Sequence, residues 1–191
     1  MECFSVLYMK IITVTEDTPY LAGGRIAFLK LCRAVALLRH NVTIITCSGA
    51  TEGVISVEPA RIVRLRIWQT RFLGPAQFIV KLFIYLFKLS SDKPEAIIVN
   101  AGYAVFPAIF AAKLMNIKVV GMYHDALALT ELFKYAVSPL RKFTAAIRWF
   151  LMYAPLRFID GIVSVSPWTA ERLKIMGVKA PIVFVGNVVE V

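Results

Sequence analysis

The stretch MKIITVTEDTPYLAGGRIAFLKLCRAVALLRHNVTIITC, residues 9–47, decides the fold class. Residues 9–15 are rich in β-branched side chains and end at turn-forming residues, which predicts a strand. Residues 24–39 carry apolar side chains at helical spacing, and residues 42–47 repeat the strand pattern. A strand, a glycine-containing loop, a helix and a second strand in this order indicate the start of a parallel α/β sheet.

The same alternation continues along the chain. Further strands are expected at 62–68, 96–99, 118–122, 161–165 and 182–185, and further helices at 75–89, 103–114, 139–153 and 168–176. Strand 62–68 alternates apolar residues with Arg64 and Arg66, which is typical of a strand with one solvent-facing side near a sheet edge. We therefore predict an α/β fold, a Rossmann-like parallel sheet with helices on both faces.

Length and composition narrow the class of protein. The chain has 191 residues, which suits one compact domain. Hydrophobic residues make up 59% of it, above the roughly 45–50% of an ordinary domain, so either burial is extensive or an apolar surface faces a partner. No uninterrupted apolar run is long enough to span a membrane and no signal-peptide pattern is found, so we expect a cytoplasmic protein. Cys3, Cys32 and Cys47 lack a CxxC spacing and are expected to be buried thiols, with neither a disulfide framework nor a metal site.

The formal net charge of +10 is distributed unevenly. Residues 59–91 and 132–159 hold eleven of the 22 basic residues and no acidic residue. In the second segment Arg141 and Arg148 share one helical face, and the apolar face carries Phe143, Ile147, Phe150 and Leu151. Such a helix either lies on an anionic membrane surface, at the inner face of the membrane, or packs on the core with a solvated basic edge. No nucleic-acid-binding motif is present, so nucleic acid is not an expected partner.

Loops at the carboxyl ends of parallel strands are where ligands bind in such sheets. Gly23 and Gly24 stand directly before a helix, where free N–H groups can bind an anion, although the pair is equally compatible with a tight turn. His124 and Asp125 follow strand 118–122. The imidazole can act as a base or donate a hydrogen bond to a substrate, or it can be purely structural.

Two more loops hold candidate residues. Asn100 and Tyr103 offer an amide and a phenol after strand 96–99, which suits carbohydrate contact as well as an ordinary loop. Ser166 precedes Pro167 at a predicted helix start, so its hydroxyl caps the helix, faces a ligand, or does both. The chain contains neither GxGxxG nor GxxxxGK[ST], so it has no fingerprint of a dinucleotide-binding domain or a P-loop NTPase.

Taken in order, these pieces resemble the N-terminal domain of the GT-B glycosyltransferases, in particular the retaining glycosyltransferase family 4 (group 1). The resemblance covers about residues 9–190. The stretches that carry it are 9–15 (MKIITVT), Pro19 through Gly23-Gly24, 39–46 (RHNVTIIT), 119–125 (VVGMYHD), 159–166 (IDGIVSVS) with Glu171 and Gly177, and 185–190 (VGNVVE).

The resemblance implies transfer of a sugar from a nucleotide-sugar donor to a glycan, lipid or other acceptor, in a cleft between two Rossmann-like domains. It implies no metal and no cofactor other than the donor as co-substrate. His124 would be the catalytic residue, in contact with the transferring sugar, and Gly23 and Gly24 would lie near the donor diphosphate and the acceptor. The other substrate or donor-binding candidates are Asn100, Tyr103, Asp125, Ser166 and Asn187.

The resemblance also predicts the domain organisation. Residues 1–8 form an N-terminal extension, residues 9–185 the acceptor-side domain, and residues 186–191 the start of a linker in which Val188 and Glu190 replace the family's usual glycine and aspartate. The family's donor-binding domain would begin where this chain stops, so we expect activity only with that domain or a separate donor subunit. The alternative is a non-catalytic Rossmann-like binding module, associated with a membrane.

Overall fold

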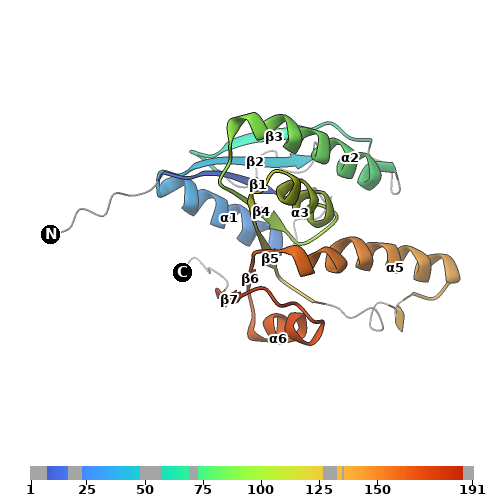
Figure 1. Ribbon diagram of the computed structural model, residues 1–191. Helices are drawn as coiled ribbons and strands as arrows, with labels where there is room; N and C mark the ends of the chain where they lie inside the picture. The colour runs from blue at the N-terminus through green and yellow to red at the C-terminus, as the bar shows by residue number, and fades with distance from the viewer. Residues whose placement is uncertain are drawn as a thin grey trace.

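The computed structural model of the chain describes residues 8–16, 23–47, 57–68, 73–126, 133–134 and 136–186. These residues form a seven-stranded, wholly parallel sheet in the order β3-β2-β1-β4-β5-β6-β7 (Figure 1). The strands are β1 (Lys10–Val14), β2 (Asn41–Cys47), β3 (Arg61–Leu65), β4 (Ala96–Asn100), β5 (Lys118–Tyr123), β6 (Gly161–Ser164) and β7 (Ile182–Phe184). The helices are α1 (Gly23–Leu37), α2 (Leu73–Lys88), α3 (Val105–Leu114), α5 (Pro139–Tyr153) and α6 (Pro167–Ile175), with 3₁₀ turns η1 (Leu89–Asp92) and η2 (Ala154–Phe158).

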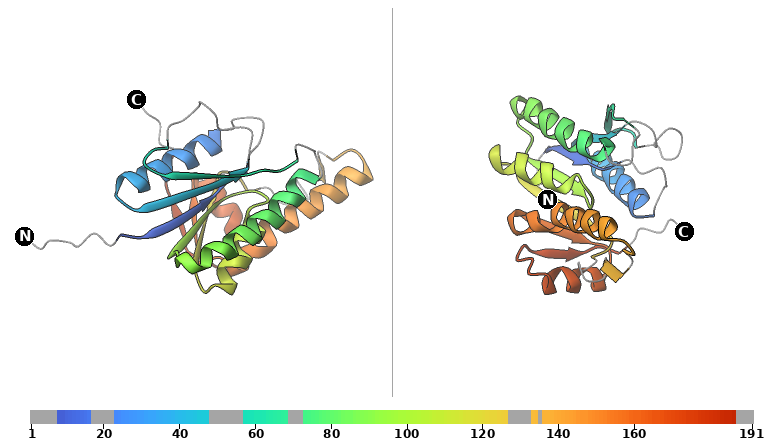
Figure 2. Two further views of the ribbon diagram at one scale, coloured as in Figure 1. Left: turned by 90° about the horizontal axis from the view of Figure 1, so that it is seen from above. Right: turned by 90° about the vertical axis from the view of Figure 1, so that its right-hand side faces the viewer.

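The helices lie on both faces of the sheet, as the sequence predicts. Two hydrophobic clusters fill the space between the layers. One cluster includes side chains of α2, α3 and α6, the end of α5 and one side of the central strands. The other joins α1 to the opposite side of β2. The views in Figure 2 accordingly show α2, α3 and α5 side by side on one face and α1 on the other.

The central strands β4 and β5 carry fully buried side chains. In β4 and β5 the residues Ile97, Val99 and Val119 have no exposed surface, as expected of parallel strands covered on both sides. Tyr123 at the end of β5 is also fully buried, and its hydroxyl donates a hydrogen bond of 3.1 Å to the carbonyl of Met152. This bond attaches the last turn of α5 to the middle of the sheet.

The predicted helices and strands are confirmed to within three residues at each end, and the class of fold is confirmed. The largest difference is the third strand, which was expected at 62–68 and ends at Leu65. Its neighbour β2 ends at Cys47, which is in register with Leu65, and the register partner of Arg66 lies outside the described residues. β3 lies at the sheet edge, as the alternating pattern indicates. Cys32 and Cys47 are buried thiols, and Cys3 lies outside the described residues.

One described helical segment, Leu73–Asp92, is long and apolar enough to cross a membrane by length and composition alone. In the fold this segment is α2 with η1, and α2 packs against α3 and β3. Phe78, Leu82 and Leu86 on its inner side have at most 2% exposed surface. One side of the helix therefore belongs to the core of the domain.

Candidate functional site at the carboxyl edge of the sheet

The strand order changes direction between β1 and β4, and this point positions the candidate site. β1 pairs with β2 on one side and with β4 on the other. The chain leaves β1 toward α1 on one face and leaves β4 toward α3 on the opposite face. In open parallel sheets such a switch point opens a crevice outside the carboxyl ends of the strands, and ligands bind there.

Gly24 and His124 meet at this edge although they are 100 positions apart in the sequence. Gly24 lies in the first turn of α1, and His124 directly follows β5. A Cβ atom built on Gly24 would lie 2.7 Å from Cγ and 2.8 Å from Cδ2 of the imidazole. Real Cβ atoms do not approach so closely, so the absence of a side chain at Gly24 is what lets the imidazole lie against the start of α1.

The imidazole of His124 has an unused polar atom. Its Nε2 is buried and has no hydrogen-bond partner among the residues that the structure describes. Burial lowers the pKa of His124 below its usual value, and the nearby Asp125 carboxylate opposes this shift. A neutral imidazole with a buried, unpaired nitrogen can hydrogen-bond to a ligand at neutral pH.

Ser166 holds the loop after β6 next to the loop of His124. The Ser166 hydroxyl accepts a hydrogen bond of 3.0 Å from the backbone N–H of Thr169 and donates one of 2.9 Å to the Thr169 hydroxyl. The Thr169 hydroxyl in turn donates to the carbonyl of His124 at 3.1 Å. Ser166 is thus the N-cap of α6, as the Ser-Pro pair indicates, and its cap also positions the backbone at His124.

Glu16 forms a second part of the site. It follows β1, and its Oε1 accepts a hydrogen bond of 3.0 Å from the backbone N–H of Ala104, just before α3. Gly102 has a φ of +152°, which favours glycine, and a Cβ atom there would overlap Oε1 of Glu16. Burial raises the pKa of Glu16 to about 7, against the lowering effects of the Ala104 N–H and of Arg148.

Side chains from α5 and β4 surround this carboxyl group. The Arg148 guanidinium carbon lies 5.7 Å from the centre of the Tyr103 ring, a cation–π arrangement. Asn100 is 8% exposed, and its Nδ2 donates to the Thr15 hydroxyl at 3.2 Å. Its Oδ1 is buried and has no partner among the described residues. The edge thus combines a carboxyl group, a guanidinium, a phenol and an amide oxygen, which is a set suited to hydroxyl-rich ligands.

The predicted site residues differ in their contacts and in their exposure. Gly24 and His124 lie in direct contact, while Asn100 and Tyr103 lie beside Glu16, on the neighbouring strand ends. Gly23 begins α1, Asp125 is exposed, and Asn187 lies outside the described residues.

Sequence reasoning did not single out Glu16 or Arg148. Glu16 is visible in the sequence only as the first acidic residue after a predicted strand, and Arg148 only as one of several cations on a helix. Their common feature, a position around Tyr103, depends on the packing of α5 against α3. Within the described ranges, no group of three His, Cys, Asp or Glu side chains is arranged to hold a metal ion.

A model of the family described as Glycosyltransferase Family 4 matches residues 22–191 of the chain. A search of curated proteins found no significant sequence match. Solved structures, by contrast, match the fold over nearly the whole chain. A putative UDP-N-acetylglucosamine 2-epimerase from Listeria monocytogenes is 14% identical over 94% of this chain and 45% of that chain, with a TM-score of 0.64.

Two further structures contain nucleotides. UGT2 from Phytolacca americana, complexed with UDP-2fluoro-glucose and pterostilbene, is 12% identical over 96% of this chain and 55% of that chain, with a TM-score of 0.63. HepE from Anabaena, in complex with UDP and glucose, is 13% identical over 96% of this chain and 45% of that chain, with a TM-score of 0.62. The chain spans about half the length of these proteins. At such low identity the similarity shows the shared fold alone, one Rossmann-like half of a GT-B protein.

Proposed function

Because the chain belongs to Glycosyltransferase Family 4, we propose that it forms the acceptor-side half of an enzyme that transfers a sugar from a nucleotide-sugar donor to an acceptor hydroxyl. The bond between the anomeric carbon and the diphosphate oxygen breaks, and the acceptor oxygen bonds to that carbon with retention. The acceptor proton leaves with the nucleoside diphosphate. The observation that carries the proposal is the contact between Gly24 and an imidazole whose buried Nε2 has no partner among the described residues.

The donor side of the proposed site is the start of α1. Free N–H groups at a helix N-terminus favour an anion, and the first turn of α1 begins at Gly23. His124, adjacent to Gly24, would hydrogen-bond to the transferring sugar through Nε2. The bound UDP in the HepE structure and the UDP-sugar in the UGT2 structure support a uridine nucleotide as the first donor to test.

The acceptor side is the group around Glu16. A carboxyl group whose pKa is raised by burial to about 7 is partly protonated at neutral pH and can accept or donate a hydrogen bond to an acceptor hydroxyl. The free Oδ1 of Asn100 and the phenol of Tyr103 are further contacts for the acceptor. Asp125, Ser166 and Asn187 stay predicted contributors, Ser166 through its cap.

The proposal includes a second domain or subunit that binds the donor from the opposite side. This chain spans about half the length of the GT-B structures, which supports a partner of similar size. We also propose that the enzyme works at the inner face of the membrane as a peripheral protein, because α2 and α5 carry the exposed cations Lys88, Arg141 and Lys142.

The test is reconstitution. The chain is produced alone and together with a donor-binding domain of the family, and release of UDP from a panel of UDP-sugars is measured with and without candidate acceptors. Acceptor-dependent release is expected only with both halves. His124→Ala should lower the rate by about 10²- to 10³-fold, the usual loss when an electrostatic contact to the reacting centre is removed.

The matched control is the other histidine. His40 lies outside the carboxyl edge. Its Nδ1 accepts a hydrogen bond of 3.2 Å from the Met9 N–H, just before β1. His40→Ala should leave the transfer rate unchanged in the reconstituted enzyme. Unchanged transfer in His124→Ala would refute the role of His124, and robust turnover by the chain alone would refute the need for a second half. Donor binding without release by any combination would favour the non-catalytic module.

A further inference from the structure

The outer side of α2 is apolar and solvent-exposed. Leu73, Val80, Ile84 and Phe87 follow one another at intervals of seven, four and three residues, which places them on one side of a helix with 3.6 residues per turn. Between 39% and 57% of each of these side chains is exposed. The opposite side of α2 carries Phe78, Leu82 and Leu86, which fill the core. The helix therefore has two apolar sides, and only one of them is covered.

α5 also exposes an apolar side. Leu140, Phe143, Ile147 and Phe150 recur at intervals of three, four and three residues, and all four side chains are at least 45% exposed. Only Met152 and Tyr153, at the end of the helix, are buried. Of the predicted apolar face of α5, Phe143, Ile147 and Phe150 are therefore exposed and do not pack on the core, and Leu151 is half-buried. The helix extends away from the sheet (Figure 1).

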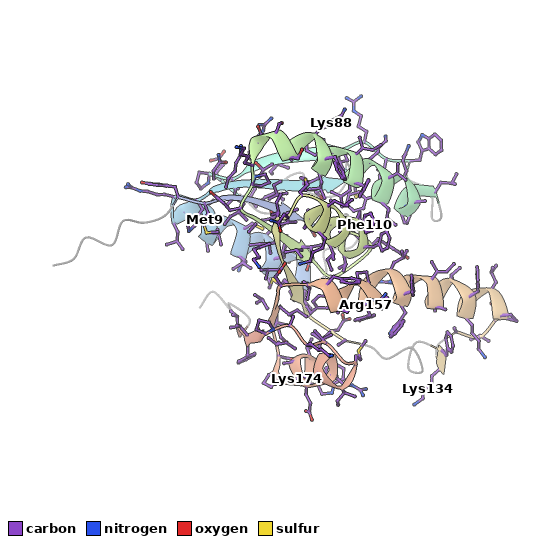
Figure 3. All side chains as sticks on the ribbon, viewed as in Figure 1. Met9, Lys88, Phe110, Lys134, Arg157 and Lys174 are labelled. Carbon is purple, nitrogen blue, oxygen red and sulfur yellow. The ribbon has the colours of Figure 1, made fainter. Side chains whose placement is uncertain are left out.

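α3 connects the two helices. It packs between α2 and α5, and Phe110 lies on it between them (Figure 3). The Phe110 ring centre is 5.9 Å from that of Phe83, which is 4.9 Å from that of Phe87. Phe110 and Leu114 are 51% and 59% exposed. The outward sides of α2, α3 and α5 thus form one apolar surface, which we call the three-helix face.

The charged side chains of these three helices are all cationic. None of the three helices contains an aspartate or a glutamate. Lys88, Arg141 and Lys142 are exposed and make no ion pair with any residue that the structure describes. Lys88 flanks the apolar side of α2, while Arg141 and Lys142 lie on the sides of α5 away from its apolar stripe, about 100° and 200° around the helix from Leu140. An apolar stripe on one side of a helix and unpaired cations on its other sides are typical of helices that lie in the surface of a bilayer with anionic headgroups, which offers acyl chains and negative charge together.

We propose that the three-helix face docks in the plane of an anionic lipid bilayer, with the apolar stripes of α2 and α5 below the headgroups and the cations among them. A second copy of the chain is a poorer occupant, because a symmetric contact through this face would gather the cations of both copies around one interface, with no acidic side chain on these helices to offset them. A spanning position for α2 would pull Phe78, Leu82 and Leu86 out of the core.

The docking surface and the candidate site share α5. Arg148 extends from α5 to the Tyr103 ring, so the helix that would lie on the bilayer also contributes to the carboxyl edge. The docking proposal itself does not rest on the proposed transfer reaction. Lipid binding can be measured on the chain with no donor, acceptor or second domain present.

The experiment is co-sedimentation of the chain with vesicles of phosphatidylglycerol mixed with phosphatidylcholine, and with vesicles of phosphatidylcholine alone. Binding to the anionic vesicles is expected at low salt and should weaken at high salt, because screening shortens the reach of the cations. The triple variant Lys88→Gln, Arg141→Gln, Lys142→Gln should lose on the order of 100-fold in partitioning, at the usual contribution of a basic residue near such a surface. The double variant Phe143→Ser, Ile147→Ser should lose binding at any salt concentration.

Matched controls lie outside the three-helix face. The triple variant Arg33→Gln, Arg39→Gln, Lys179→Gln removes the same charge from exposed positions on α1 and on the loops after α1 and α6. The double variant Leu37→Ser, Leu38→Ser removes exposed apolar side chains at the end of α1. Both controls should bind as the wild type does, and circular dichroism should show that every variant is folded.

A local measurement identifies the docking face independently of the affinities. A polarity-sensitive fluorophore is attached to Phe143→Cys or, as control, to Leu38→Cys. Anionic vesicles should shift the emission of the first to the blue and leave the second unchanged. No binding to anionic vesicles at low salt would overturn the proposal. Equal losses in the control variants, a blue shift at position 38 instead of 143, or a lipid-independent dimer that protects position 143 would also overturn it.

Discussion

Substitution of Gly24 by alanine tests the central contact of the site. The new Cβ atom would begin 2.7 Å from Cγ of His124, whereas unstrained carbon atoms lie about 3.5–4.0 Å apart. The imidazole must therefore move by roughly 1 Å, or the start of α1 must move away from it. Either change separates the two groups that we place on the donor side.

The expected magnitudes differ for stability and for transfer. Overpacking of this kind costs about 1–3 kcal/mol of unfolding free energy, and the better helix propensity of alanine offsets up to about 1 kcal/mol of it. We therefore expect Gly24→Ala to lower the unfolding free energy by about 1 kcal/mol. Transfer should fall by about 100-fold, because a displacement near 1 Å at a reacting centre has an effect of that size.

The assay is a double-mutant cycle of Gly24→Ala and His124→Ala. Two quantities are measured for each variant: the unfolding free energy of the chain in urea and the transfer rate of the reconstituted enzyme. In the His124→Ala background the ring is gone, so Gly24→Ala should no longer destabilise the protein. The coupling free energy between the two positions should be about 1–2 kcal/mol. In the same background the second substitution should cause no further loss of transfer.

The opposite result would refute the contact. If Gly24→Ala destabilises the protein equally with and without the imidazole, the alanine methyl group meets something other than His124. If it lowers transfer further in the absence of His124, the glycine acts on the donor by itself. In either case the function assigned to the pair has to be withdrawn.

Three further predictions concern the rest of the carboxyl edge. Burial raises the folded-state pKa of Glu16 to about 7, above its unfolded value, so the folded protein binds the proton more tightly than the unfolded chain does. The unfolding free energy should therefore fall as the pH rises from about 5 to 8, by up to about 3 kcal/mol. Glu16→Gln should remove this pH dependence from the urea unfolding midpoints. Gly102→Ala combines an unfavourable φ with an overlap on Glu16 and should lower the unfolding free energy by about 2 kcal/mol. The melting temperature should then be about 4–8 °C lower. An unchanged melting temperature would contradict the overlap. Ser166→Ala should cost about 1 kcal/mol through loss of the α6 cap, with Ser166→Asp, which can still cap, as the control in the same thermal assay.

The order and type of the helices and strands could be predicted from the sequence because the signals are local. An alternation with a period of two or of 3.6 residues is complete within one element, so the run 118–122 and the helix from Pro139 were recognisable without knowledge of their neighbours. The resemblance to the family rests on the order of short stretches, and a model of that family matches residues 22–191. The predicted position of His124 at a strand end is confirmed for the same reason.

The composition of the site could not be read from the sequence. Glu16, Gly102 and Arg148 are separated by 86 and 46 positions, and only the pairing of β1 with β4 and the packing of α5 bring them together. The strand order that creates the switch point is likewise decided by tertiary packing, since each parallel strand has two edges that present the same backbone donors and acceptors.

What the sequence determined by itself is therefore the α/β alternation, the family and the strand ends at which chemistry is expected. Only the tertiary structure shows that the imidazole of His124 lies against Gly24, that Glu16 lies beside Tyr103, and that α2 and α5 expose apolar stripes to solvent. The physical reason is that periodicity shows that a helix has an apolar side, while its neighbours decide whether that side is covered. The core covers one apolar side of α2 and leaves a second one in solvent, whereas α5 is buried only at its end and exposes its apolar stripe.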